Sequence, residues 1–226
     1  MNDQSVLFDL DGTLIDTVPD FIASCHAICE QDHLPKPSDA AIKATVSQGV
    51  AGFIQLLYGT DVTPSHADTL KLQFLDYYQQ QCGLNAKLFD GLRPCLEFLN
   101  NHDIPWGVVT NKPIRFPALI LERLALEPPS SVIVCPDHVS EPKPSPEGLL
   151  LAARQLGIEP AQCIYAGDHQ RDILAGQHAG MHTIACAFGY LETKDDPQQW
   201  HANTIVYSPH ELTNYLLSLL STLKPL

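Results

Sequence analysis

The chain has 226 residues, of which 45% are hydrophobic, 13 are lysine or arginine and 26 are aspartate or glutamate. This length suits one core domain with an insertion. A formal net charge of −13 disfavours a nucleic-acid-binding surface and the proteins that carry one.

The first predicted strand, residues 5–10, leads two acidic side chains into a glycine turn. Asp9 and Asp11 are two residues apart, so an extended backbone directs both side chains to the same side. Two carboxylates this close repel each other unless a cation lies between them or their pKa values separate. The pattern therefore indicates a divalent metal site or an acid–base pair, although Asp11-Gly12 is also typical of a turn with solvated acids.

Residues 17–84 carry apolar side chains at helical spacing and show no strand-like alternation. The spacing predicts helices at 19–32, 38–57 and 64–81. Pro19 suits the first turn of a helix, and Ser38 suits an N-cap. We therefore predict a helical insertion at 17–84 between two core segments, 1–16 and 85–226.

The seven cysteines are an odd number without any Cys-x-x-Cys pair, which is typical of small buried side chains rather than of a disulfide framework. A metal site on the first helix is an alternative, because Cys25 and Cys29 lie four residues apart with His26 and His33 nearby. Sites with such soft ligands usually use four of them at a recognisable spacing.

Strand-like and helix-like segments alternate from residue 85 onward. This alternation predicts an α/β fold, with a Rossmann-like parallel sheet as the core and an all-helical cap domain inserted in it. Ligands of such sheets bind at the carboxyl ends of the strands. Strands are expected near 105–110, 131–135, 162–167, 182–186 and 204–207, and helices near 92–102, 114–125, 146–157, 170–179 and 209–221.

Polar side chains follow three of these later strands. Thr110 and Asn111 offer a hydroxyl and an amide to phosphate oxygens, although Asn111 could equally serve a turn. Lys143 stands between two prolines and provides a fixed cation, unless it is a solvated loop lysine. Asp168 and Asp172 come after the strand at 162–167, so acids again follow a strand.

In order and spacing these residues resemble the four motifs of the haloacid dehalogenase superfamily. The resemblance implies a helical cap hinged near residues 15–18 and 83–91. It also implies phosphate-ester chemistry, because the dehalogenase members lack an acid two residues after the nucleophile. The motifs are Asp9-x-Asp11-Gly12-Thr13, Thr110, Lys143 and Gly167-Asp168-x-x-x-Asp172.

The resemblance also implies a role for each motif residue. Asp9 would attack phosphorus to form an aspartyl-phosphate, and Asp11 would protonate the leaving oxygen and then activate water. Backbone N–H groups up to Gly12, with Thr110 and Lys143, would hold the phosphate oxygens. The implied cofactor is Mg²⁺. Its site residues would be Asp9, Asp11 through its backbone carbonyl, Asp168 and Asp172, the last by orienting waters or Lys143.

Other segments, such as 106–116 and 135–139, look like the phosphoglycolate phosphatase branch and its N-acetylmuramic acid 6-phosphate phosphatase relatives. Gln48 and Gly49 resemble that branch's substrate loop, but the arginine that often follows is absent. We therefore expect an amino-sugar 6-phosphate to be preferred over 2-phosphoglycolate. The alternative is a β-phosphoglucomutase-like mutase, which shares all four motifs. A non-catalytic binding protein would require the loss of a catalytic residue, and none is missing.

The expected partner is a small-molecule phosphate ester, with no nucleic acid and no membrane, for a monomer or weak homodimer. Only Met1 to Gln4 precede the first apolar run, which is too short for a signal peptide. No apolar run is long enough to predict a membrane span. Together these features predict a cytoplasmic protein.

Overall fold

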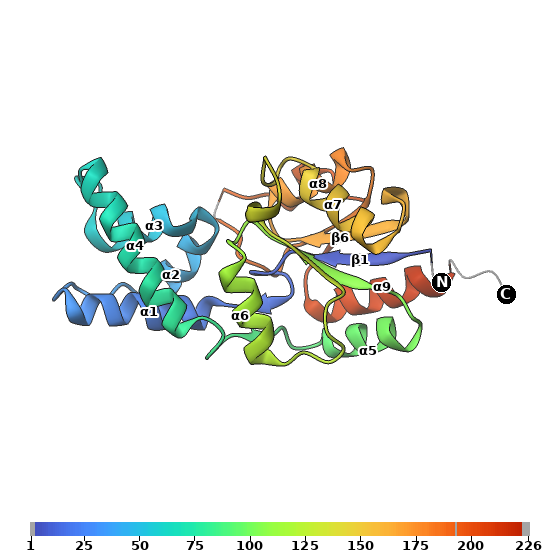
Figure 1. Ribbon diagram of the computed structural model, residues 1–226, viewed down its shortest axis with the longest axis horizontal. Helices are drawn as coiled ribbons and strands as arrows, with labels where there is room; N and C mark the ends of the chain where they lie inside the picture. The colour runs from blue at the N-terminus through green and yellow to red at the C-terminus, as the bar shows by residue number, and fades with distance from the viewer. Residues whose placement is uncertain (1–2, 193, 223–226) are drawn as a thin grey trace. The chain divides into compact units, whose positions relative to one another are not determined.

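The computed structural model describes residues 3–192 and 194–222, and its chain forms two units (Figure 1). The first unit consists of Met1–Ile15 and Leu88–Leu226, and the second of Asp16–Lys87. Two short strands, β2 (Ile15–Asp16) and β3 (Lys87–Leu88), pair with each other where the chain passes between the units. These strands were not predicted, because two residues are too few to show a period in the sequence.

The first unit is built on a six-stranded parallel sheet with the order β5-β4-β1-β6-β7-β8. All four residues of β1 are buried, as expected for a central strand covered on both faces. This confirms the predicted parallel α/β core. The strands are β1 (Ser5–Phe8), β4 (Trp106–Val109), β5 (Val132–Val134), β6 (Cys163–Gly167), β7 (His182–Cys186) and β8 (Thr204–Val206).

Helices cover both faces of the sheet. Figure 1 shows α7 and α8 on one face and α5 and α9 on the other. Right-handed crossovers explain this division, because the chain runs towards one sheet edge up to β5 and then returns through β6 to β8. The helices are α5 (Arg93–Asn101), α6 (Arg115–Leu124), α7 (Glu147–Leu156), α8 (Gln170–His178) and α9 (Pro209–Thr222).

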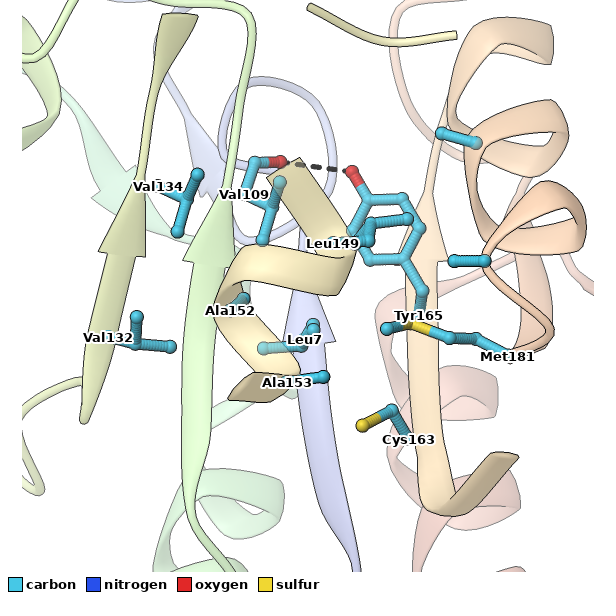
Figure 2. Packing of buried hydrophobic residues seen from close by; sticks show 12 residues of the cluster. Leu7, Val109, Val132, Val134, Leu149, Ala152, Ala153, Cys163, Tyr165 and Met181 are labelled. Carbon is cyan, nitrogen blue, oxygen red and sulfur yellow. Dashed lines mark hydrogen bonds between the residues drawn. The ribbon is translucent and has the colours of Figure 1, made fainter. Parts of the chain in front are cut away.

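Tyr165 lies in the core between the sheet and helices α7 and α8. Leu7, Leu149 and Tyr165 are completely buried there, with valines of β4 and β5 beside them (Figure 2). The Tyr165 hydroxyl donates to the Val109 carbonyl at 3.0 Å. A buried tyrosine needs such a partner, and this one places the hydroxyl at the carboxyl ends of β4 and β6.

The strand order brings three predicted site residues next to one another. Asp9, Thr110 and Asp168 follow β1, β4 and β6, and β1 lies between the other two strands. The backbone ladder continues beyond the strands, since the Asp9 N–H donates to the Ala166 carbonyl at 2.8 Å and the Thr110 N–H donates to the Val134 carbonyl at 3.0 Å. The backbones of Asp9 and Thr110 are therefore fixed by the sheet.

The second unit is helical and has its own aromatic core. Phe21 stacks on Phe53 and Tyr78, with ring centroids 4.9 and 4.4 Å apart, and Phe53 stacks on Phe74 at 4.9 Å. The buried Asp20 carboxylate accepts backbone N–H groups from residues 83, 85 and 86 and so fixes the end of the unit. Its helices are α1 (Val18–Gln31), α2 (Asp39–Thr45), α3 (Gly49–Tyr58) and α4 (Pro64–Gln81).

Two predictions for this unit were wrong. The single helix at 38–57 is divided into α2, a short 3₁₀ turn at Val46–Gln48, and α3. Gly49 causes the break with a φ of +67°, which costs glycine little. The segment Asp39–Tyr58 also has the length and composition of a membrane span, contrary to expectation. The break at Gly49 and the burial of Phe53 in the aromatic core are features of a core helix.

Candidate active site

The loop after β1 carries two acids in different surroundings. Asp9 is buried, and its Oδ1 accepts a hydrogen bond from the Lys143 ammonium at 2.7 Å. Asp11 is half-buried, and its Oδ1 accepts from the Lys112 ammonium, also at 2.7 Å. The two carboxylates thus have separate cationic partners. Although Asp9 and Asp11 are only two residues apart in the sequence, their side chains lie in different surroundings.

Glycine is required at position 12 for two reasons. Its φ is +82°, and a Cβ there would lie 2.1 Å from Oδ2 of Asp168. Gly12 therefore lets the first loop approach Asp168 closely. The Gly12 N–H donates to the Ile15 carbonyl at 3.1 Å and so contributes to the shape of the loop. Its contact with a phosphate oxygen stays a prediction.

Lys143 is the central cation of the site, and its side chain is 3% exposed. Its ammonium lies 2.7 Å from Asp9, 2.6 Å from Asp172, 2.7 Å from the Tyr165 hydroxyl and 2.9 Å from the Val109 carbonyl. Burial acts to lower the pKa of Lys143, but the two carboxylates outweigh it and hold the pKa above its usual value. Lys143 is therefore a fixed positive charge beside Asp9.

Asn111 holds Lys143 in place through its side chain. Its Nδ2 donates to the Lys143 carbonyl at 2.9 Å, and its Oδ1 accepts the Lys143 N–H at 3.0 Å. The amide thus positions the backbone of Lys143, and its contact with a phosphate or substrate stays a prediction. Thr110 is 5% exposed, and its hydroxyl oxygen accepts the Lys112 N–H at 3.2 Å. The O–H of this hydroxyl can still donate, and a phosphate oxygen is a suitable acceptor for it.

Three buried carboxylates, of Asp9, Asp168 and Asp172, meet beside Lys143 with their oxygens within 4.8 Å of one another. Burial raises the pKa of Asp9 to about 6, although Lys143 acts to lower it. Burial, with the charges of Asp9 and Asp172, holds the pKa of Asp168 well above its usual value. One ammonium cannot balance three carboxylates, so the cluster favours a bound cation. A set of oxygen donors suits Mg²⁺.

The two outer acids of the cluster are held by backbone groups. Asp168 accepts the Tyr190 N–H at 2.7 Å. Asp172 accepts the His169 N–H at 3.0 Å, while the His169 ring accepts the Arg171 N–H at 3.3 Å, so the two side chains cap the start of α8. The sequence left the role of His169 open, and the structure assigns it to this cap. Burial lowers its pKa.

Three further residues of the site were not predicted from the sequence. Lys112 had a signal, because a cation directly follows Thr110 and Asn111 at a strand end. Tyr165 had none, because a tyrosine inside an apolar strand is indistinguishable from an ordinary core residue. Tyr190 acts through its backbone N–H, which any residue except proline supplies.

Gln48 and Gly49 belong to the second unit, at the end of the 3₁₀ turn and the start of α3, and both are exposed. Their contact with a substrate stays a prediction. The cysteines follow the expected pattern, since all seven are free and buried, and burial raises the pKa of Cys25 to about 12. Within residues 3–192 and 194–222, the three aspartates are the only group of three or more candidate metal ligands.

Comparisons with known proteins show the family of this chain. A family model described as haloacid dehalogenase-like hydrolase matches residues 6–186. An N-acetylmuramic acid 6-phosphate phosphatase of Pseudomonas putida is 40% identical over 96% of this chain and 97% of its own length. A phosphoglycolate phosphatase of Xanthomonas campestris is 37% identical over 92% of this chain and 94% of its own length.

Solved structures share the fold. A protein of Haemophilus somnus, described as a predicted phosphoglycolate phosphatase, superposes with a TM-score of 0.82 at 23% identity and covers 95% of this chain and 99% of its own. A Thermotoga maritima protein, provisionally assigned as a beta-phosphoglucomutase, gives a TM-score of 0.74 at 24% identity and covers 98% of this chain and 100% of its own. The fold is thus common to proteins described as phosphatases and as mutases.

Proposed function

The chain belongs to the haloacid dehalogenase-like hydrolase family, and from this we propose that it is a Mg²⁺-dependent phosphatase of small phosphomonoesters that acts through an aspartyl-phosphate on Asp9. One observation carries the proposal: Asp9 ends the central strand beside both a fixed cation, Lys143, and two further buried carboxylates. A nucleophile for an anionic phosphoryl group needs such compensation.

The donor set fits a hard divalent cation, because all three candidate ligands are buried carboxylates and no cysteine or histidine is among them. The Asp9 and Asp168 carboxylates would hold Mg²⁺, with the Asp11 carbonyl as a further ligand. Asp172 orients Lys143 at 2.6 Å and serves the metal indirectly. Bound Mg²⁺ would neutralise charge on the phosphate and on Asp9, so that the two anions can approach.

The residues of the chain then divide the reaction between them. A carboxylate oxygen of Asp9 forms a bond to phosphorus while the ester oxygen departs and takes a proton from Asp11. Lys143 and the Thr110 hydroxyl stabilise the charge that spreads over the equatorial oxygens. Water then attacks the phosphorus of the aspartyl-phosphate and gives its proton to Asp11. The step releases inorganic phosphate and restores the Asp9 carboxylate.

A screen of phosphate release from small phosphomonoesters, with Mg²⁺ and with an excess of chelator, tests this function. We expect several esters to be hydrolysed with Mg²⁺, the activity to disappear with the chelator, and added Mg²⁺ to restore it. Full turnover in excess chelator would refute the role of the metal. No release from any ester, with folded protein and Mg²⁺, would refute the phosphatase function.

Metal binding should weaken as the pH falls through 6. Burial raises the pKa of Asp9 to about 6, so below that pH the metal-free site takes up a proton that Mg²⁺ must displace. The increase in Tm on adding Mg²⁺ should therefore be larger at about pH 7.5 than at about pH 5. Thermal denaturation with and without Mg²⁺ at the two pH values measures this increase in Tm. An equal increase at both pH values would contradict the assignment, and Asp168→Asn serves as the ligand-deficient control.

We expect N-acetylmuramic acid 6-phosphate to have a higher kcat/KM than 2-phosphoglycolate, by at least about tenfold, or about 1.4 kcal/mol. The second unit has no arginine between residues 17 and 84 to pair with a small carboxylate, but it has the glutamines Gln48 and Gln55 for hydroxyl and amide groups. Replacing these glutamines with alanine should narrow the difference. Equal constants, or a preference for 2-phosphoglycolate, would favour the plain phosphoglycolate phosphatase interpretation.

The alternative, a phosphosugar mutase, finds little support in the second unit. A mutase must hold a second phosphate, and the basic residues of segment 17–84 are three lysines. Two of them are engaged on the surface, Lys36 with Glu30 at 2.6 Å and Lys71 with Asp68 at 3.0 Å. Release of inorganic phosphate from a monophosphate, without isomerisation, distinguishes the two activities.

Replacing Asp11 with asparagine should slow both the formation and the breakdown of the phospho-enzyme, because each step needs a proton transfer. General acid–base catalysis typically contributes about 10²- to 10⁴-fold, so we expect a loss in that range. Single-turnover kinetics with rapid quenching separates the two steps. Unchanged kinetics would remove Asp11 from the proton transfers.

The remaining expectations complete the proposal. We propose a cytoplasmic monomer or weak homodimer that binds neither nucleic acid nor membranes. The acidic composition supports the absence of nucleic-acid binding. The break of the Asp39–Tyr58 segment at Gly49 supports the absence of membrane binding.

A further inference from the structure

The proposed reaction gives no role to the Tyr165 hydroxyl, although this group contacts the central cation of the site. Its oxygen accepts from the Lys143 ammonium at 2.7 Å, and its O–H donates to the Val109 carbonyl at 3.0 Å (Figure 2). Asp172 is a more distant acceptor at 3.3 Å. Burial, with the charges of nearby carboxylates, holds the pKa of Tyr165 well above its usual value, so the hydroxyl keeps the proton that it donates.

The Lys143 ammonium has more acceptors around it than N–H groups to donate. An ammonium carries three N–H groups. Among the residues that the structure describes, four oxygens lie within 2.9 Å of it, those of Asp9, Asp172, Tyr165 and Val109. A hydroxyl can accept from one partner and donate to another, which neither a carboxylate nor a carbonyl can do. When Tyr165 accepts one N–H and donates its own O–H to Val109, all four oxygens have a donor.

This arrangement sets the direction of the remaining N–H. The three N–H bonds of an ammonium point to three corners of a tetrahedron, so two bonds that are held fix the third. With one N–H on Asp172 and one on Tyr165, the third points to Asp9, which the phosphoryl group joins in the proposed reaction. Without the hydroxyl, the Val109 carbonyl at 2.9 Å would take the second N–H, and the ammonium would turn.

We propose that Tyr165 is a positioning residue, whose hydroxyl orients the Lys143 ammonium so that one N–H is directed to a phosphoryl oxygen beside Asp9. This inference rests on the proposed phosphatase function. A preorganised donor stabilises the transition state only if it already points to the developing charge. Because Tyr165 acts through Lys143, loss of the hydroxyl should slow the reaction of the phosphoryl group and leave the binding of Mg²⁺ unchanged.

The first test is Tyr165→Phe, which removes the hydroxyl and keeps the ring, whose centroid lies 5.5 Å from the ammonium. We expect kcat/KM on the best substrate of the screen to fall roughly 10-fold, as for one lost hydrogen bond to a charged group. The increase in Tm on adding Mg²⁺ should equal that of the wild-type protein. Tyr207→Phe, at a tyrosine that is 59% exposed, is the matched control and should keep wild-type activity.

A double-mutant cycle shows whether Tyr165 acts through Lys143. In a Lys143→Ala background there is no ammonium to orient, so adding Tyr165→Phe should change kcat/KM by less than about twofold. A hydroxyl that only supports the fold would lower kcat/KM by the same factor in both backgrounds. That result would overturn the proposal, and so would a wild-type kcat/KM in Tyr165→Phe.

The increase in Tm with Mg²⁺ keeps the test decisive if the double variant does not fold. An increase that shrinks together with kcat/KM in Tyr165→Phe would mean that the hydroxyl acts on the carboxylate cluster, and it would overturn the proposal. If Tyr165→Phe itself does not fold, Tyr165→Met, which also lacks a hydroxyl, replaces it. Failure of the underlying function is a different outcome, because the wild-type protein would then release phosphate from no ester.

Discussion

Replacing Asp9 with asparagine should abolish phosphate release while leaving the fold intact. Asparagine has the shape of aspartate, but its amide is not a nucleophile for phosphorus and is a poor ligand for Mg²⁺. Loss of a residue that forms the covalent intermediate typically costs at least about 10³-fold. The measurement is kcat for phosphate release with saturating Mg²⁺, together with a thermal denaturation curve that confirms the fold.

The structure explains why this substitution is a clean test. Asp9 is buried, its N–H is held by the Ala166 carbonyl, and the neutral amide removes one of three clustered negative charges. The fold should therefore tolerate the substitution. Asp68→Asn, on an exposed side chain of the second unit, is the control and should keep wild-type activity. A tenth of the wild-type rate in Asp9→Asn would place the nucleophile elsewhere.

Lys143→Ala should lower both the activity and the stability of the protein. The Lys143 ammonium contacts Asp9 and Asp172, and Asn111 binds the backbone N–H of Lys143. The ammonium is therefore a preorganised charge beside the phosphoryl group. Removing one preorganised donor costs about 2–4 kcal/mol in the transition state, or roughly 30- to 1,000-fold in kcat/KM. Steady-state kinetics on the best substrate of the screen measures the loss.

The same substitution should also lower stability, because Asp9 and Asp172 lose their cation inside the protein. Thermal denaturation in the presence of Mg²⁺ shows whether enough folded protein remains for the kinetics. Lys194→Ala, at an exposed lysine, serves as the control for both measurements. A loss of activity below tenfold in folded Lys143→Ala would reduce Lys143 to a structural residue of its loop.

The strands of the parallel sheet were predictable because their signals are local. A buried parallel strand is an apolar run, so β1, β4 and β6 stand out between helices, and the acids that follow β1 and β6 mark the strand ends. The break at Gly49 was not predictable in this way. Apolar residues continue at helical spacing on both sides of it, and only the backbone conformation shows that the helix stops.

The partners of the site residues depend on the strand order, which alternation of strands and helices does not determine. Lys112 and Asp11 are 101 residues apart, and Asn111 and Lys143 are 32 apart. The first pair meets because β4 lies beside β1 in the sheet, and the second because β5 lies beside β4. The candidate site residues could therefore be named from the sequence, whereas the pairing of Asp11 with Lys112 and the contacts of Asn111 and Tyr165 required the structure.

The phosphoryl group on Asp9 provides the most direct test of the mechanism. The Asp11→Asn variant should be mixed with substrate and Mg²⁺, quenched in acid during the first turnover, and digested for mass spectrometry. We expect the phosphoryl group on the peptide that contains Asp9, at a level that falls as phosphate is released. A phosphoryl group on another residue, or phosphate release with no phospho-enzyme at any time, would contradict the account.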